Sequence, residues 1–149
     1  MLLRWLLAAA HLLALGIGLG SVWARARLLG GGTLDTVTLR RALAADAWWG
    51  VAAALWIGSG LWRLFGATEK TTAYYFDNHV FWTKMALLAG ILVLEIRPIV
   101  VLSGWRRRLG RNETLDLRAA PGIARTSYLQ VVLVILMVLA ATAMARGIG

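Results

Sequence analysis

The chain lacks cysteine altogether, and it has only two histidines and seven acidic residues among its 149 positions. The missing cysteine excludes disulfides, thiolate metal sites and thiol nucleophiles together. Any redox chemistry must therefore come from a bound cofactor. The few acidic residues face sixteen lysines and arginines, which gives a formal net charge of +9.

Apolar residues make up most of the chain. Hydrophobic residues account for 60% of it and the mean hydropathy is +0.70, values typical of an integral membrane protein. A helical crossing needs about 20 residues, so the chain has room for four spans with short connections and no separate soluble domain. We expect residues 1–149 to form a single four-span domain, with spans at about 2–22, 43–65, 79–102 and 126–145.

The long uninterrupted apolar runs favour helices, because a membrane barrel would show segments of about ten residues with alternating polarity. Helices also satisfy the backbone hydrogen bonds within each span. Glycines at 30–32 mark a flexible turn in the first connection, and Pro121 and Gly122 are expected to break the chain just before the fourth span. Gly16 and Gly20 indicate close helix packing. The fold class predicted is all-α, a transmembrane four-helix bundle.

The distribution of lysine and arginine predicts the orientation. The first and third connections carry ten arginines, against four basic residues on the other side. By the positive-inside rule both termini lie outside, in a multi-pass protein of the bacterial inner membrane. The arginine excess follows the first apolar run instead of preceding it, which argues against a cleaved signal peptide. The net charge is explained by this topology and by contact with anionic lipids, so no nucleic-acid partner is expected.

His11 and Lys84 stand inside the first and third apolar runs. Ionisable side chains within a span are costly and usually mark a site. If both termini are outside, these two spans run in the same direction, and at 1.5 Å per residue His11 lies about 12 Å deep and Lys84 about 7 to 8 Å deep. Both positions fall in the outer leaflet, where the two side chains could share one pocket.

Helical spacing on the second span places polar, aromatic and small residues on one stripe. Charges are driven away from lipid, so this stripe should face the bundle and present the indoles of Trp49 and Trp56, with small residues between them. The stripe contains Asp46, Trp49, Ala53, Trp56, Gly60 and Arg63.

A buried imidazole with a nearby amine, aromatic walls and small residues fits a haem b better than a metal ion alone. His11 would be the axial ligand of the iron. His79 or a deprotonated Lys84 could supply a second ligand, while Arg4, Lys84 or His79 could pair with the propionates. In the alternative interpretation His11 only hydrogen-bonds a neighbouring helix and Lys84 extends its amine to the outer interface.

Glu95 is a second candidate for catalysis beside Lys84, because a carboxylate inside the third span must be paired or protonated. Arg25, Arg27 and Arg41 lie on the same side of the membrane and are its expected partners. A structural ion pair and a proton relay both remain open.

The stretches 46–63, 81–87 and 94–98 resemble a family of small bacterial membrane proteins, domain of unknown function 2214. The resemblance covers nearly the whole chain and implies the four-span architecture without assigning an activity.

A histidine early in the first span and a lysine early in the third are distantly similar to HemJ, the haem-containing membrane protoporphyrinogen oxidase, and to CopD-like copper proteins. The resemblance implies that His11 is a haem ligand and that Lys84 matches the HemJ lysine. After its histidine HemJ continues with an aromatic, proline- and arginine-rich stretch, whereas residues 12–20 here are leucine, alanine, isoleucine and glycine. Haem binding is therefore better supported than the oxidase reaction.

Three functions follow as hypotheses. The chain is a haem protein in electron transfer or oxidation, a CopD-like copper or small-ion transporter, or a cofactor-free accessory subunit of a larger membrane complex. The missing cysteine and the scarcity of paired histidine or methionine count against copper. Expected partners are the bilayer, a haem or porphyrin, and other membrane proteins or a second copy of the chain.

Overall fold

The computed structural model describes residues 1–66, 73 and 76–147. Within these residues the chain forms four long helices and no strand: α1 (Leu2–Gly30), α2 (Thr36–Phe65), α4 (His79–Gly110) and α5 (Ala120–Ala145). The prediction of an all-α bundle is confirmed. The helices extend beyond the apolar spans, so much of what the sequence assigned to the first and third connections is helical.

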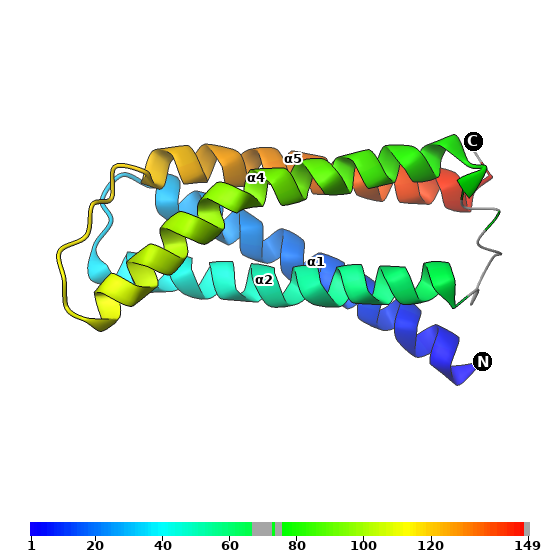
Figure 1. The fold of residues 1–149 in the computed structure, drawn as a ribbon, viewed down its shortest axis with the longest axis horizontal. Coiled ribbons are helices and arrows are strands. Elements are labelled where there is room, and N and C mark those ends of the chain that lie inside the picture. The colour runs from blue at the N-terminus through cyan, green and yellow to red at the C-terminus, as the bar shows by residue number, and fades with distance from the viewer. Residues whose placement is uncertain (67–72, 74–75, 148–149) are drawn as a thin grey trace.

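The helices run alongside one another, with connections 31–35 and 111–119 at one end and both termini at the other (Figure 1). α1 packs on α2 and α5, and α5 also packs on α4, whereas α1 and α4 make no direct helix contact. α2 and α4 approach each other only briefly, where Arg106 reaches Leu43 and Asp46. The first half of α1 diverges from α4 and α5 toward its terminus (Figure 1).

Three of the helices, α1, α4 and α5, are long and apolar enough to cross a membrane. α2 is not among them, although it has 30 residues and lies alongside the others (Figure 1). Its tryptophans, glycines and charged residues lower its hydropathy. Membrane crossing by α2 stays a prediction, while the membrane helical bundle agrees with the structure.

The helix ends follow local chemistry. α1 ends at Gly30, and Gly32 has a φ of +92°, a backbone conformation that favours glycine, so the expected turn forms here. α2 begins after Asp35, whose side chain accepts a hydrogen bond from the Thr38 N–H. Hydrogen bonding to Thr38, first to its side chain and then to its backbone, lowers the pKa of the Asp35 carboxyl.

The expected break at Pro121 and Gly122 is wrong, because both residues lie in the first turn of α5. The first N–H groups of a helix have no intrahelical acceptor, so proline is tolerated there.

The buried core has two apolar layers. The layer nearer the 31–35 connection contains Leu29, Leu39, Ala42, Leu43, Leu102, Trp105, Ala120, Ile123 and Ala124. The second contains Val22, Trp49, Ile91, Val131, Val134 and Met137. On every helix the residues between these layers include a polar one, so a polar layer separates the two apolar layers.

Close packing of α1 on α2 occurs at Gly18. A Cβ at this position would lie 3.4 Å from the Ala52 Cβ and 3.4 Å from the Trp49 ring. The expectation for Gly16 and Gly20 is wrong, because a Cβ at either position would meet nothing within 4 Å. Three glycines spaced two apart point in different directions around a helix, and only the middle one faces α2.

Gly18→Leu should destabilise the bundle by about 1 to 3 kcal/mol, the usual cost of overpacking a close contact. Gly20→Leu is the matched control, since it adds the same side chain to the same helix where space is open. Thermal unfolding in detergent measures both. Equal melting temperatures for the two variants would contradict the packing of Gly18 against Ala52 and Trp49.

Candidate functional site

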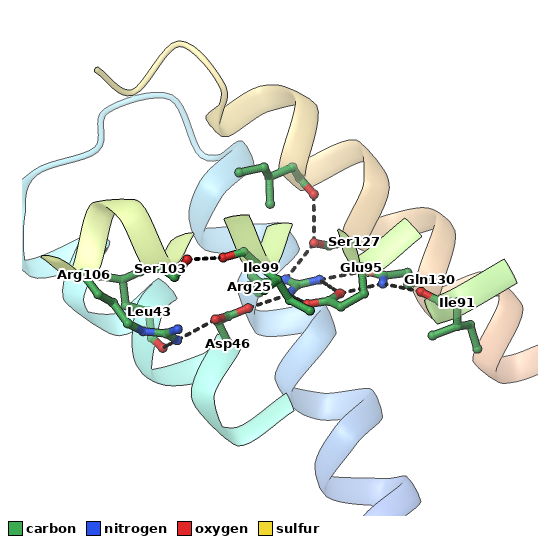
Figure 2. A network of polar contacts seen from close by, with 11 residues as sticks. Arg25, Leu43, Asp46, Ile91, Glu95, Ile99, Ser103, Arg106, Ser127 and Gln130 are labelled. Carbon is green, nitrogen blue, oxygen red and sulfur yellow. Dashed lines mark hydrogen bonds and ion pairs between the residues drawn. The ribbon is translucent and has the colours of Figure 1, made fainter. Parts of the chain in front are cut away.

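Arg25 of α1 is fully buried, with 0% of its side chain exposed, and it is the centre of the polar layer. A guanidinium has five N–H donors, and five hydrogen bonds engage Nε, Nη1 and Nη2 here (Figure 2). Nε donates to Ser127 Oγ (2.9 Å). Nη1 donates to Asp46 Oδ1 (2.6 Å) and Glu95 Oε1 (2.8 Å). Nη2 donates to Glu95 Oε2 (2.9 Å) and Gln130 Oε1 (2.7 Å).

The partners come from the three other helices, Asp46 from α2, Glu95 from α4, and Ser127 and Gln130 from α5. The pairing with Glu95 is bidentate, the geometry in which arginine binds carboxylate most strongly. One side chain thus joins all four helices, although α1 and α4 make no direct helix contact.

A second arginine balances the charge of the layer. Arg106 Nη2 donates to Asp46 Oδ2 (2.5 Å) and to the Leu43 carbonyl (2.8 Å). With Arg25 and Arg106 positive and Asp46 and Glu95 negative, the cluster is formally neutral.

The two neutral side chains of the network, Gln130 and Ser127, form further hydrogen bonds. Gln130 Nε2 donates to Glu95 Oε2 (2.7 Å) and to the Ile91 carbonyl (3.2 Å). Ser127 Oγ donates to the Ile123 carbonyl (2.8 Å) while it accepts from Arg25. A buried network satisfied in this way rigidifies a core, whereas a partly satisfied one is costly.

The structure selects one of the three expected partners of Glu95. Arg25 binds it, whereas Arg27 and Arg41 lie exposed. Arg106, Ser127 and Gln130 are members of this network that the sequence did not reveal. The two acids Asp46 and Glu95 could have indicated Arg106, because two carboxylates that face the bundle need more than one cation for neutrality.

His11 lies on α1 against α2. Its Nδ1 is 2.8 Å from Ser59 Oγ, its ring is 5.8 Å from the Trp56 ring, and a Cβ at Gly60 would lie 3.5 Å from its Cε1. Ser59 directs its single hydroxyl proton to the Leu55 carbonyl at 2.7 Å. We therefore assign the imidazole proton to Nδ1, which donates to Ser59 Oγ and leaves Nε2 as the acceptor nitrogen.

The hollow near this histidine is small. It has about 0 Å³ of space for a water-sized molecule, whereas ligand pockets begin at roughly 300 Å³. Trp56 Nε1 is buried and has no hydrogen-bond partner within the described chain. The site supplies an imidazole but no space for a porphyrin ring, so a haem does not fit this arrangement. The hollow is lined by Ala14, Leu15, Gly18, Leu19, Trp49, Ala52, Ala53, Trp56 and Val134.

The other predicted haem residues lie elsewhere. Lys84 is partly buried on α4 and close enough to Arg63 of α2 for the two cations to repel each other. His79, the first residue of α4, and Arg4 in the first turn of α1 are exposed. His11 contacts Ser59 and Trp56 of α2, whereas Lys84 lies on α4, a helix whose backbone does not pack on α1.

Arg25→Gln should destabilise the bundle by about 3 to 5 kcal/mol, because it leaves the Asp46 and Glu95 carboxylates buried with less compensating charge. Arg27→Gln removes the same charge from an exposed position two residues away and should change stability by less than about 0.5 kcal/mol. Thermal unfolding of the full chain in detergent compares them. A small loss in both variants would show that Arg25 does not hold the helices together.

Comparison with known proteins adds a family but no activity. No curated protein and no solved structure matches the chain. None of these comparisons supports a similarity to HemJ or to CopD-like proteins. Residues 3–149 match the model of a family described as a predicted membrane protein. The chain belongs to that family, domain of unknown function 2214.

Proposed function

We propose that this membrane protein is a cofactor-free accessory subunit, which binds another membrane protein through the first half of α1. The observation that carries the proposal is the divergence of this segment from α4 and α5 (Figure 1). The half of the bundle nearer connections 31–35 and 111–119, called the inner half here, is instead held together by the Arg25 network. One half of the bundle is fixed, whereas in the other half α1 contacts α2 at His11 and diverges from α4 and α5.

The two carboxylates of the polar layer are already engaged. Both oxygens of Glu95 accept from Arg25, and both oxygens of Asp46 accept from arginines. Protonating either carboxylate during turnover would break bonds on which helix packing depends. This arrangement favours a structural ion pair over a proton relay for Glu95.

The outer segment of α1 is apolar and poorly covered. More than half of the side-chain surface of Leu3, Trp5, Leu12 and Leu13 is exposed. In lipid, helix association depends on van der Waals packing, because the acyl chains are as apolar as leucine. The side chains of this segment that point away from α2 lack such packing unless another protein supplies it.

Site-specific photo-crosslinking in the native membrane tests the role of this segment. A photoreactive residue replacing Leu6 of α1 should give one discrete protein adduct, because this position faces the proposed partner. The same residue replacing Leu139 of α5 is the control, since that side chain is also exposed but lies on a helix packed between its neighbours. Adducts with lipid alone at both positions, or the same protein adduct at both, would contradict docking through α1.

A haem protein is the second candidate, and one observation favours it. Ser59 holds the His11 Nδ1 proton, and a second hydrogen bond of this kind orients histidines that ligate metals through Nε2. Haem at His11 would require α1 and α2 to separate around Trp56, since the hollow there is too small. Electron transfer or HemJ-like oxidation, with Lys84 and Glu95 as catalytic residues and His79, Trp49 and Arg4 near the haem, belongs to this candidate.

The visible absorption spectrum separates the two candidates. Protein purified after haem-replete expression should show no Soret band if the chain is a cofactor-free subunit. A Soret band that disappears in His11→Ala and persists in His79→Ala, with both variants folded, would overturn the accessory role and establish haem bound at His11.

A further inference from the structure

We propose that an open cleft between the start of α2 and the end of α4 binds the phosphate headgroup of an anionic phospholipid. The cleft has a volume of about 340 Å³ and is lined by Arg40, Leu43, Arg106, Leu109 and Gly110. Its volume falls within the range of about 300 to 1,000 Å³ that is typical of ligand sites. It is independent of the α1 segment proposed to bind a protein.

The two arginines give the cleft its specificity for anions. Arg40 makes no hydrogen bond or ion pair with any described residue. Arg106 donates to Asp46 and Leu43 through Nη2 only. Its Nη1 and Nε make no hydrogen bond with a described residue, so they can donate to another acceptor. Its side chain is 39% exposed, which makes these donors accessible. Figure 2 shows Arg106 at the edge of the polar network beside Leu43 and Asp46.

The acidic residues of the nearby 111–119 connection do not neutralise these arginines. Glu113 pairs with Arg111 (3.8 Å) and Asp116 with Arg118 (3.7 Å). The positive charge of Arg40 is therefore available to a ligand, and Arg106, whose charge is balanced by Asp46, can still donate from Nη1 and Nε. A phosphate group accepts hydrogen bonds from two guanidiniums in the geometry that arginine favours.

The apolar walls indicate a lipid as the source of the phosphate. Leu43 and Leu109 border the arginines, and free phosphate would gain nothing from such walls. The cleft lies at the end of the bundle that carries connections 31–35 and 111–119 (Figure 1), which the arginine distribution predicts to be cytoplasmic. Basic pockets between helices on that side of a membrane are typical sites for anionic headgroups.

The site also touches the network that holds the bundle. Asp46 bridges Arg106 and Arg25, so a phosphate on the remaining donors of Arg106 would restrain the side chain that supports Asp46. Anionic lipid should thus reinforce the inner half of the bundle.

Native mass spectrometry of the full chain in detergent tests the proposal, with phosphatidylglycerol and phosphatidylcholine as probes. Wild-type protein should retain phosphatidylglycerol in preference to phosphatidylcholine. Arg40→Gln should weaken retention of phosphatidylglycerol by about tenfold, the effect of losing a charge-assisted contact. Arg40→Lys should recover most of that loss, because it restores the charge.

Arg107→Gln is the matched control, since it removes an exposed arginine from the same end of α4 without touching the cleft. It should leave retention within about twofold of wild type, as expected for a charge that makes no direct contact. Equal losses in Arg40→Gln and Arg107→Gln, or equal retention of the two lipids, would overturn the site. Displacement of phosphatidylglycerol by millimolar inorganic phosphate would overturn the lipid as its ligand.

Discussion

The structure depends on the cost of placing a guanidinium inside a membrane bundle. Arg25 is fully buried, and leaving even part of its charge or its five N–H groups unpaired in this setting would cost several kcal/mol. The sequence meets the requirement with two carboxylates, one amide and one hydroxyl, contributed by three different helices. These bonds form only when the helices are in register. The free-energy cost of burying Arg25 unpaired therefore disfavours every other arrangement of the helices.

The rest of the architecture follows from where this requirement acts. Near the Arg25 layer the four helices are drawn together, and apolar layers close above and below it. Toward the termini no ion pair given for the described residues joins α1 to α4, and α1 diverges (Figure 1). Arg106 carries the network to the surface at the other end, where it lines an open cleft. The Arg25 network thus accounts for the fixed inner half of the bundle, for the divergence of the first half of α1, and for the position of Arg106 in the open cleft.

The sequence predicted the elements better than their contacts. Uninterrupted apolar runs identified the helices, and the isolated acid Glu95 required a partner, which placed Arg25 among three candidates. It could not choose the partner, because helical spacing gives the face of a residue and not the neighbour that this face meets. The same limit explains Gly16 and Gly20, whose spacing is compatible with packing although only Gly18 contacts α2. The predicted topology puts His11 and Lys84 at similar depths in parallel spans, but depth carries no information about lateral order, and α5 instead of α4 packs beside α1.

A double-mutant cycle between Arg25 and Glu95 tests the central claim most directly. The cycle compares the unfolding free energies in detergent of wild type, Arg25→Gln, Glu95→Gln and the double variant. If the bidentate pair joins α1 to α4, the double variant should be more stable than the sum of the single effects predicts, with a coupling of about 2 kcal/mol. Additive effects, with a coupling below about 0.5 kcal/mol, would contradict the account.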